Sequence, residues 1–247
     1  MDEDIQREAL AATLEAIADR IEAEKDHLTE LDSAIGDADH GANLHRGFRA
    51  ALDGADPEDD PEAFVKAVGM ALLSTVGGAS GPLYGGSLAV ASAEFEKGIT
   101  TDSSVAFAEA YLEKVKDRGG ASVGDATMVD ALTPAVHTYK RAIEVDDLEP
   151  LAALSKAVDA AERGVAFTTP IRANKGRASY LGWRSVGHPD PGATSTLYLL
   201  EAIHAVAAEY LDGEAATVAE AEAEAETENE AGTDVESESK TGPEVGE

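Results

Sequence analysis

The chain contains no cysteine, which excludes disulfide bonds, zinc sites built on thiolates and catalysis by a thiol. Only 5% of its residues are aromatic, and 19 lysines and arginines stand against 49 aspartates and glutamates. The resulting formal charge of −30 argues against binding to nucleic-acid backbones or anionic membranes. No apolar run approaches membrane-spanning length, and the first residues, MDEDIQREAL, are acidic rather than typical of a signal sequence. We therefore expect a soluble, cytoplasmic protein that contacts neither nucleic acid nor membrane.

The negative charge is spread along the chain. Residues 214–247 hold twelve acids and one lysine, so they supply −11 and leave −19 on the remainder. They carry no bulky core residues, and such a composition cannot bury enough apolar surface to become ordered. We predict a domain over 1–213 and a disordered acidic tail over 214–247. The acidity of the domain itself favours a surface adapted to high salt, as in a halophilic organism; the alternative is an ordinary acidic protein.

Apolar residues recur at helical spacing along most of the domain, whereas the alternation typical of strands is nearly absent. The first apolar stripe consists of Leu10, Leu14, Ile17 and Ile21. The expected helices cover about 2–27, 43–54, 61–76, a stretch that opens within 77–88 and lasts to 97, 103–118, 125–143, 147–173 and 193–212. An irregular segment is expected over 174–192. This pattern of about eight helices predicts an all-α domain.

The most informative stretch is LDSAIGDADHGANLHRGF, residues 31–48. Asp32, Asp37 and Asp39 lie within eight residues, and the small residues between them predict a tight loop in which the acids converge. Mg²⁺ usually binds through a few carboxylates together with waters or substrate phosphates. The motif therefore predicts a Mg²⁺ site for a phosphorylated ligand, with a solvated acidic turn as the alternative. An EF-hand is excluded, because its twelfth position counted from Asp37 is Phe48 instead of a bidentate glutamate.

Residues 77–86, GGASGPLYGG, predict a backbone that a ligand approaches closely. The helix that follows directs its positive end towards these glycines, so a phosphate is the natural guest and the Ser80 hydroxyl an additional donor. The alternative is a glycine-rich crossing of two helices. The site is not a P-loop, because no GxxxxGK[ST] motif occurs in the chain.

Two further stretches contain candidate site residues. VGDATMVDALTPA, residues 123–135, predicts a helix start with Met128 on its first turn, where a core position and a ligand contact both remain open. GRASYLGWRSVGHPDPGATS, residues 176–195, is a long irregular segment, and such segments are usually functional when they are not of low complexity. Arg177 or Arg184 would neutralise phosphate charge there, or pair with a local acid.

The chain resembles the nucleotide-binding L subunits of dihydroxyacetone kinases over about residues 1–212. The resemblance rests on four motifs in the same order: LDSAIGDADHG, GGASGPLYG, GDATMVDAL, and GRASYLG followed by RSVGHPDPGA. It implies an eight-helix antiparallel barrel whose loops at one end bind ADP or ATP through two Mg²⁺ ions. The implied metal ligands are Asp32, Asp37 and Asp39. The implied nucleotide-side positions are His40, Gly41, Asn43, Ala79, Ser80, Leu83, Gly119, Met128, Arg177, Asp190, Pro191 and Gly192, with Leu83 and Met128 flanking the adenine.

Three positions depart from the pattern of the family. Ala38 stands where the family commonly has glycine, which is a mild change if the backbone there keeps a negative φ. Ala126 replaces a common lysine and Trp183 a common glutamate. These two changes are expected to affect partner docking or salt tuning.

The resemblance implies that metal ions and backbone donors perform the phosphoryl transfer, without a catalytic side chain on this subunit. In the family a separate K subunit holds dihydroxyacetone through a covalent bond to a histidine. We therefore expect a K-subunit partner, and a homodimer or hetero-oligomer. A chain without the K domain favours the phosphotransferase-system version, in which a phosphohistidine protein rephosphorylates bound ADP.

Three alternatives remain open. In an ATP-dependent kinase, ATP enters and ADP leaves in each cycle, normally on a fused chain. The nucleotide domain of a fatty-acid kinase shares the aspartate motif, but it normally continues into further large domains. A regulatory subunit would bind nucleotide without transferring a phosphoryl group.

Overall fold

A computed structural model describes residues 3–211 of the chain, and the predicted tail, 214–247, lies outside the described residues. Within 3–211 every regular element is helical, which confirms the all-α fold class. The α-helices are α1 (Glu3–Ala23), α2 (Lys25–Ile35), α3 (His40–Gly54), α4 (Pro61–Thr75), α5 (Ser87–Ala91), α6 (Thr101–Gly119), α7 (Met128–Glu144), α8 (Pro150–Thr168) and α9 (Pro191–Tyr210). A π-helix, η1 (Gly81–Gly86), precedes α5, and 3₁₀ turns form η2 (Ser92–Phe95) and η3 (Arg177–Ser185).

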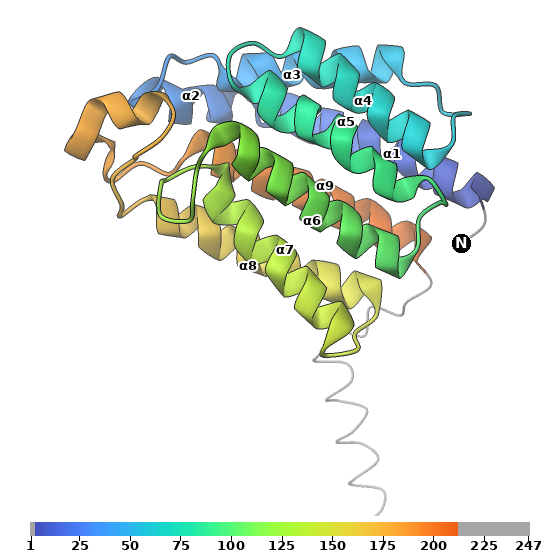
Figure 1. The fold of residues 1–247 in the computed structure, drawn as a ribbon. Coiled ribbons are helices and arrows are strands. Elements are labelled where there is room, and N and C mark those ends of the chain that lie inside the picture. Colours follow the sequence, from blue (N-terminus) through green and yellow to red (C-terminus); the bar gives the residue numbers. More distant parts are fainter. Residues whose placement is uncertain (1–2, 212–247) are drawn as a thin grey trace, which may run out of the picture. The chain divides into compact units, whose positions relative to one another are not determined.

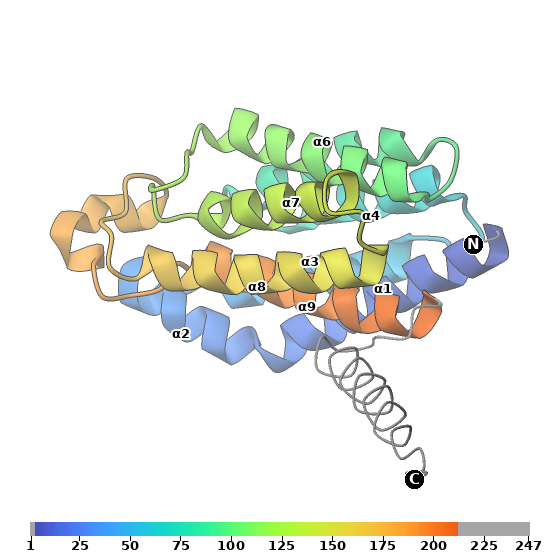
Figure 2. The same cartoon turned by 90° about the horizontal axis from the view of Figure 1, so that it is seen from below.

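The helices form a closed ring (Figures 1 and 2). Each member packs against the next in the order α1, α3, α4, η1 with α5, α6, α7, α8 and α9, and α9 packs back against α1. Ring neighbours run antiparallel (Figures 1 and 2), so the predicted eight-helix antiparallel barrel is confirmed. We call the end with the α2–α3, α4–η1, α6–α7 and α8–α9 connections the mouth. The distal end carries the other connections and the end of α9.

Two helices begin with the same pair of residues. At α4 the Oδ1 atom of Asp60 accepts a hydrogen bond from the backbone N–H of Ala63 at 2.8 Å, and Pro61 follows. At α9 the Oδ2 atom of Asp190 accepts from the backbone N–H of residue 193 at 2.7 Å, and Pro191 follows. Proline suits the first helical position because its missing N–H would have no intrahelical partner. Local sequence therefore determines where α4 and α9 begin.

The prediction of a single helix over 2–27 followed by an acidic loop is wrong. The chain bends at Glu24, and a separate helix, α2, extends to Ile35 with Leu28 buried on its inner face. Asp32 consequently lies on the last turn of a helix, and α3 begins at His40, three residues earlier than expected. The segment expected to be irregular over 174–192 contains the 3₁₀ turns of η3. The predicted stretch that ends at 97 is composed of η1, α5 and η2.

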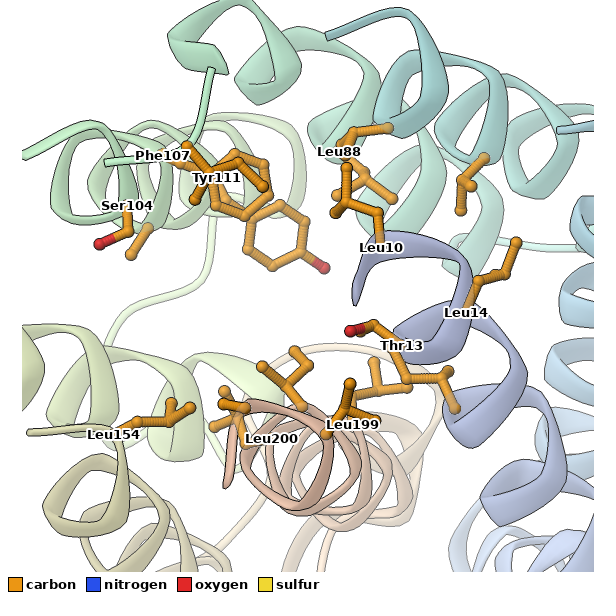
Figure 3. A pocket seen from close by; sticks show the side chains of 18 of the residues that line it. Leu10, Thr13, Leu14, Leu88, Ser104, Phe107, Tyr111, Leu154, Leu199 and Leu200 are labelled. Carbon is orange, nitrogen blue, oxygen red and sulfur yellow. The ribbon is translucent and has the colours of Figure 1, made fainter. Parts of the chain in front are cut away.

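The centre of the barrel is apolar. Side chains from α1, α5, α6 and α9 surround a cavity of about 400 Å³ (Figure 3). Its wall includes Leu10, Leu14, Leu88 and Leu199, and most of the other side chains that line it are apolar as well. The apolar surface of the helices is thus directed inwards. None of the helices within 3–211 is long and apolar enough to cross a membrane.

Candidate functional site

The site begins with Asp32, whose carboxylate stabilises the start of the next helix. Its Oδ2 atom accepts hydrogen bonds from the backbone N–H groups of Asp39 at 2.8 Å and His40 at 3.1 Å. These groups need an external acceptor, because the first N–H groups of a helix have no intrahelical partner. The other oxygen, Oδ1, lies against Gly36, where any Cβ atom would overlap it. Glycine at 36 therefore leaves the space that Asp32 occupies.

Three carboxylates converge at the mouth. One oxygen each from Asp32, Asp37 and Asp39 lies within 4.8 Å of the others, the only such group of potential metal ligands found within residues 3–211. Arg177 of η3 lies beside them, with its Nη2 atom 2.8 Å from Oδ2 of Asp37. This guanidinium offsets part of the repulsion between the acids. Three hard oxygen donors at this spacing fit Mg²⁺ by their chemistry.

The turn that holds two of these acids contains an alanine in an unfavourable conformation. Ala38 has φ of 61°, in the left-handed region, so the negative φ that would have made its replacement of glycine mild is not observed. Ala126, before α7, has φ of 56°. For a residue other than glycine, this region costs about 1–2 kcal/mol. The backbone at both positions is therefore strained.

A chain of hydrogen bonds joins three helix starts behind the carboxylates. The Nε2 atom of His40 lies 2.9 Å from Oγ of Ser195, and this oxygen lies 2.8 Å from the hydroxyl of Tyr84. The Tyr84 hydroxyl also donates to the carbonyl of Gly192 at 3.1 Å. Burial lowers the pKa of His40 and raises the pKa of Tyr84 to about 12. Both groups are therefore neutral near pH 7, and the network fixes α3, η1 and α9 relative to one another.

The glycine-rich segment has two structural roles. Gly77, Gly78, Ala79 and Ser80 form the turn that faces the mouth. Beyond it, Gly85 of the π-helix packs so closely on α4 that a Cβ atom would overlap the backbone nitrogen of residue 73. The helix crossing, considered as an alternative to a ligand loop, therefore exists next to the loop. π-helical turns of this kind occur frequently at functional sites.

These elements surround a cavity of about 470 Å³, within the usual range for small-molecule sites. Thirteen of the residues expected in the site line this cavity. They are Asp32, Asp37, Asp39, His40, Ala79, Ser80, Leu83, Gly119, Met128, Arg177, Asp190, Pro191 and Gly192. Gly41 and Asn43 do not line it. Gly41 instead packs against the backbone of α2, and the Oδ1 atom of Asn43 accepts from Arg46 Nη2 at 2.7 Å.

Sequence reasoning missed two cations in the cavity wall, Arg118 and Lys175. Arg118 donates a hydrogen bond to the carbonyl of Gly86 at 3.2 Å. Arg118 directly precedes Gly119, an implied nucleotide-side position, and Lys175 directly precedes Gly176, the first residue of the fourth motif. This adjacency is the sequence signal for both cations. With Arg177, three cations line one cavity together with the three converging carboxylates and Asp190. Such a mixture suits a polyphosphate bound together with a divalent cation.

Asp190, the residue that caps α9, is a fourth acid in the cavity wall. Its backbone N–H donates to the buried Thr168 hydroxyl at 2.9 Å. Burial raises the pKa of Asp190 to about 7, and the nearby charges of Asp130 and Asp32 add to the shift. The starts of α3, α7 and α9 all border the same cavity. Their partial positive charges make the mouth favourable for an anion.

Comparison with known proteins identifies relatives along most of the chain. The family model described as the DAK2 domain matches residues 34–205. The PEP-dependent dihydroxyacetone kinase, ADP-binding subunit DhaL, of Escherichia coli K12 is 37% identical over 209 residues, which cover 83% of this chain and 99% of that protein. The PTS-dependent dihydroxyacetone kinase, ADP-binding subunit DhaL, of Lactococcus lactis is 40% identical over 193 residues, 77% of this chain and 92% of that protein.

Longer proteins also match. Human triokinase/FMN cyclase is 33% identical over 78% of this chain, but the match covers only 34% of that protein. The solved structure of the dihydroxyacetone kinase of C. freundii has a TM-score of 0.63 and 25% identity, covering 79% of this chain and 34% of that chain. A structure of that kinase in complex with AMP-PNP and Mg²⁺ matches with a TM-score of 0.61. The same barrel thus occurs in short subunits and within longer kinases.

Proposed function

The chain belongs to the DAK2-domain family, and we propose on that basis that it is the ADP-binding subunit of a dihydroxyacetone kinase. It would transfer a phosphoryl group from bound nucleotide to dihydroxyacetone held on a separate K subunit. The observation that carries this proposal is the cavity at the mouth. Its wall combines three converging carboxylates, three cations and three helix starts, which together suit a nucleotide bound with a divalent cation.

Each part of the wall has a distinct role in this proposal. Asp32, Asp37 and Asp39 would hold two Mg²⁺ ions, which supply charge neutralisation at the phosphates when bound. The turn at 77–80 donates backbone N–H groups and the Ser80 hydroxyl to phosphate oxygens. Leu83 and Met128 provide an apolar surface for the adenine. The chain thus contributes positioning and charge rather than a covalent step.

The remaining expected residues would support the site in two ways: some position neighbouring helices or side chains, and others shape the cavity wall. His40 holds the start of α9 through Ser195, and Gly41 permits the close approach of α3 to α2. Asn43 lies outside the cavity wall and positions Arg46. Gly119, Asp190, Pro191 and Gly192 shape the nucleotide side of the cavity.

The source of the phosphoryl group distinguishes two versions of this function. We favour bound ADP that a phosphohistidine protein of the phosphotransferase system rephosphorylates in place. In support, the short relatives that match over 92–99% of their length are named PEP- or PTS-dependent. The second candidate exchanges ATP for ADP in each cycle, and the AMP-PNP and Mg²⁺ complex of the similar C. freundii kinase supports it.

The test is to analyse what the purified protein carries. The protein is purified in high salt, transferred to nucleotide-free buffer and denatured, and the released nucleotide and magnesium are quantified. Stoichiometric ADP with magnesium is the expected result. If the purified protein carries no nucleotide, and the native protein then binds and exchanges ATP and ADP rapidly, the second version is supported. Failure to bind either nucleotide would contradict both.

A further inference from the structure

Residues 163–189 differ in charge from the rest of the chain. They contain five of the 19 lysines and arginines and none of the 49 acids. This stretch runs from the last turns of α8 through η3 to the start of α9, so most of it lies at the mouth, in the orange part of Figure 1. A cationic segment therefore borders the cavity in a chain whose formal charge is −30.

One side of this segment is anchored to the barrel. Ala173 and Ala178 are buried with Ile35 of α2 and Ala126 of the α6–α7 connection in a small apolar cluster. The Ser185 hydroxyl accepts a hydrogen bond from the backbone N–H of Ala173 at 2.9 Å, which closes the segment on itself. The exposure of its other side is therefore not the result of a loose loop.

The other side carries large exposed side chains. Tyr180 and Trp183 are 87% and 76% exposed, more than any other large apolar side chain within residues 3–211. The guanidinium carbon of Arg172 lies 5.7 Å from the centroid of the Trp183 ring, and Arg184 is exposed next to it. We call these four residues the aromatic–arginine patch. None of the four lines the cavity, so the nucleotide site does not account for them.

We propose that the aromatic–arginine patch is a docking surface for an acidic surface of the protein subunit that carries the phosphoryl acceptor. This inference rests on the proposed function. Tryptophan, tyrosine and arginine are the residue types that contribute most to binding at protein interfaces. The patch is continuous along the chain with Lys175 and Arg177, which line the cavity. A protein docked on the patch therefore has its acceptor beside the mouth.

Charge identifies the kind of partner. The formal charge of −30 repels an acidic protein at most positions, whereas the acid-free segment attracts one. Docking at the mouth is thus favoured over docking elsewhere on the barrel. The same overall charge disfavours nucleic acid and anionic membranes, whose charge extends over a larger area than two arginines neutralise.

The chain contains its own reporter, because Trp183 is its only tryptophan. Acrylamide quenching of its fluorescence is measured for the protein alone, with ADP and Mg²⁺, and after addition of the dihydroxyacetone-binding subunit from the same organism. A Trp183→Phe variant mixed with that subunit supplies the background from the partner. We expect ADP and Mg²⁺ alone to leave quenching unchanged, and the partner to reduce it and shift the emission to shorter wavelength. Protection by ADP and Mg²⁺ alone, or no protection by the partner, would overturn the inference.

Variants separate the patch from the nucleotide site. Trp183→Ala, and separately Arg172→Glu combined with Arg184→Glu, should weaken binding of the partner about tenfold or more, as expected for central interface residues. The affinity for ADP should remain that of the wild type in both. Lys156→Glu is the matched control, since this exposed lysine lies on α8 twelve residues before the helix ends, about 18 Å along its axis.

Three outcomes count against the patch: wild-type partner affinity in Trp183→Ala, equal weakening in Lys156→Glu, or displacement of the partner by anionic vesicles or DNA at comparable charge concentration. The proposed function fails in a different way. In that case the wild-type protein binds no ADP, or transfers no phosphoryl group at saturating partner. The two failures are therefore distinguishable.

Discussion

An acid-rich turn lies at each end of the barrel: residues 36–39 with Asp32 at the mouth, and residues 55–60 at the distal end. In the distal turn two carboxylates, those of Asp56 and Asp60, each bond to their own stretch of backbone. The Oδ1 atom of Asp56 accepts from the N–H of residue 58 at 3.0 Å, and that of Asp60 accepts from residue 63 at 2.8 Å. At the mouth, Asp32 bonds to N–H groups seven and eight residues away.

The difference between the two turns is the range of the carboxylate hydrogen bonds. Short-range bonds orient each acid separately, and the distal acids form no metal-type group among the residues that the structure describes. The longer-range bond from Asp32 draws the end of α2 onto the start of α3, and Asp37 and Asp39 lie on the turn between them. A high density of acids is therefore not sufficient to form a metal site. At the mouth, the Asp32 carboxylate connects two helices and so brings the carboxylates of Asp37 and Asp39 close to its own.

The largest expected difference between the two turns is the effect on ADP affinity of removing one carboxylate from each. Asp37→Ala is expected to weaken binding of ADP in the presence of Mg²⁺ by about 100-fold or more, because a direct ligand matters at least as much as its supporting groups. Isothermal titration calorimetry measures the affinity, and circular dichroism should report an unchanged helical fold. The distal control, Asp56→Ala, should bind as the wild type does. Unchanged affinity in Asp37→Ala would contradict the metal site.

The second prediction concerns the space beside Asp32. A Cβ atom in Gly36→Ala would overlap Oδ1 of Asp32, so its carboxylate must leave the start of α3. We expect about tenfold weaker ADP binding and a free energy of unfolding lowered by about 2 kcal/mol, the effect of losing a helix cap. Nothing lies within 4 Å of a Cβ built at Gly54, at the distal end of α3, so Gly54→Ala should be neutral or slightly stabilising. Urea denaturation of both variants, with calorimetric titration, tests this contrast.

The third prediction compares the two Asp-Pro helix starts. The pKa of Asp190 is raised from 3.8 to about 7, chiefly by burial, so the folded state retains its proton at pH values where the unfolded state loses it. Its stabilising contribution is present below about pH 4 and is lost as the pH rises through 7. Asp190→Asn keeps a cap acceptor without the charge. Its free energy of unfolding, relative to that of the wild type, should therefore increase by on the order of 2 kcal/mol from pH 5 to pH 8.

Urea denaturation without metal or nucleotide, at pH 5 and pH 8, measures this gain for Asp190→Asn. The control is Asp60→Asn, because Asp60 caps α4 in the same way at the exposed distal end. It should change stability equally at both pH values. If Asp190→Asn also changes the free energy of unfolding by the same amount at pH 5 and pH 8, burial does not distinguish the two caps.

The smallest effect is expected from relief of strain. Ala38→Gly should raise the free energy of unfolding by about 1 kcal/mol, because glycine adopts a φ of 61° without the clash of a Cβ atom. Asp147, in the distal α7–α8 connection, has φ of 52° and serves as the comparison. Aspartate tolerates this region better than alanine, so Asp147→Gly should gain less. A thermal or urea denaturation series measures both, and a larger gain at 147 would contradict the prediction.

Local pattern predicts the barrel because each long helix presents an apolar stripe of helical period. It fails at α2, where a polar residue, Asp32, occupies a buried position on the last turn. That position is stable only because Asp32 bonds to the backbone of α3. A local sequence window does not contain this contact, so the small residues around Asp32 predict a loop instead of the end of a helix. The same long-range contact creates the site.

The motifs identify most of the cavity wall because each contains the start or the end of a helix at the mouth. They do not predict the π-helix η1, whose wider turn depends on the close packing of Gly85 against Gly69 of α4. Nor do they identify Gly41 and Asn43 as residues behind the wall. The direction of a side chain at a helix start depends on the neighbouring helix, which the local sequence does not specify.

The closure of the ring has a consequence for modularity. Because α1 and α9 are antiparallel neighbours, Glu3 and Leu211 both lie at the distal end, far from the mouth. A linker joined to either terminus of the barrel would leave the nucleotide cavity and the aromatic–arginine patch uncovered. This geometry explains how one barrel serves both as nearly the whole of a 37%-identical subunit and as about a third of the C. freundii kinase chain. A covalent connection at the distal end would thus change what the barrel is joined to without changing the residues that line the mouth.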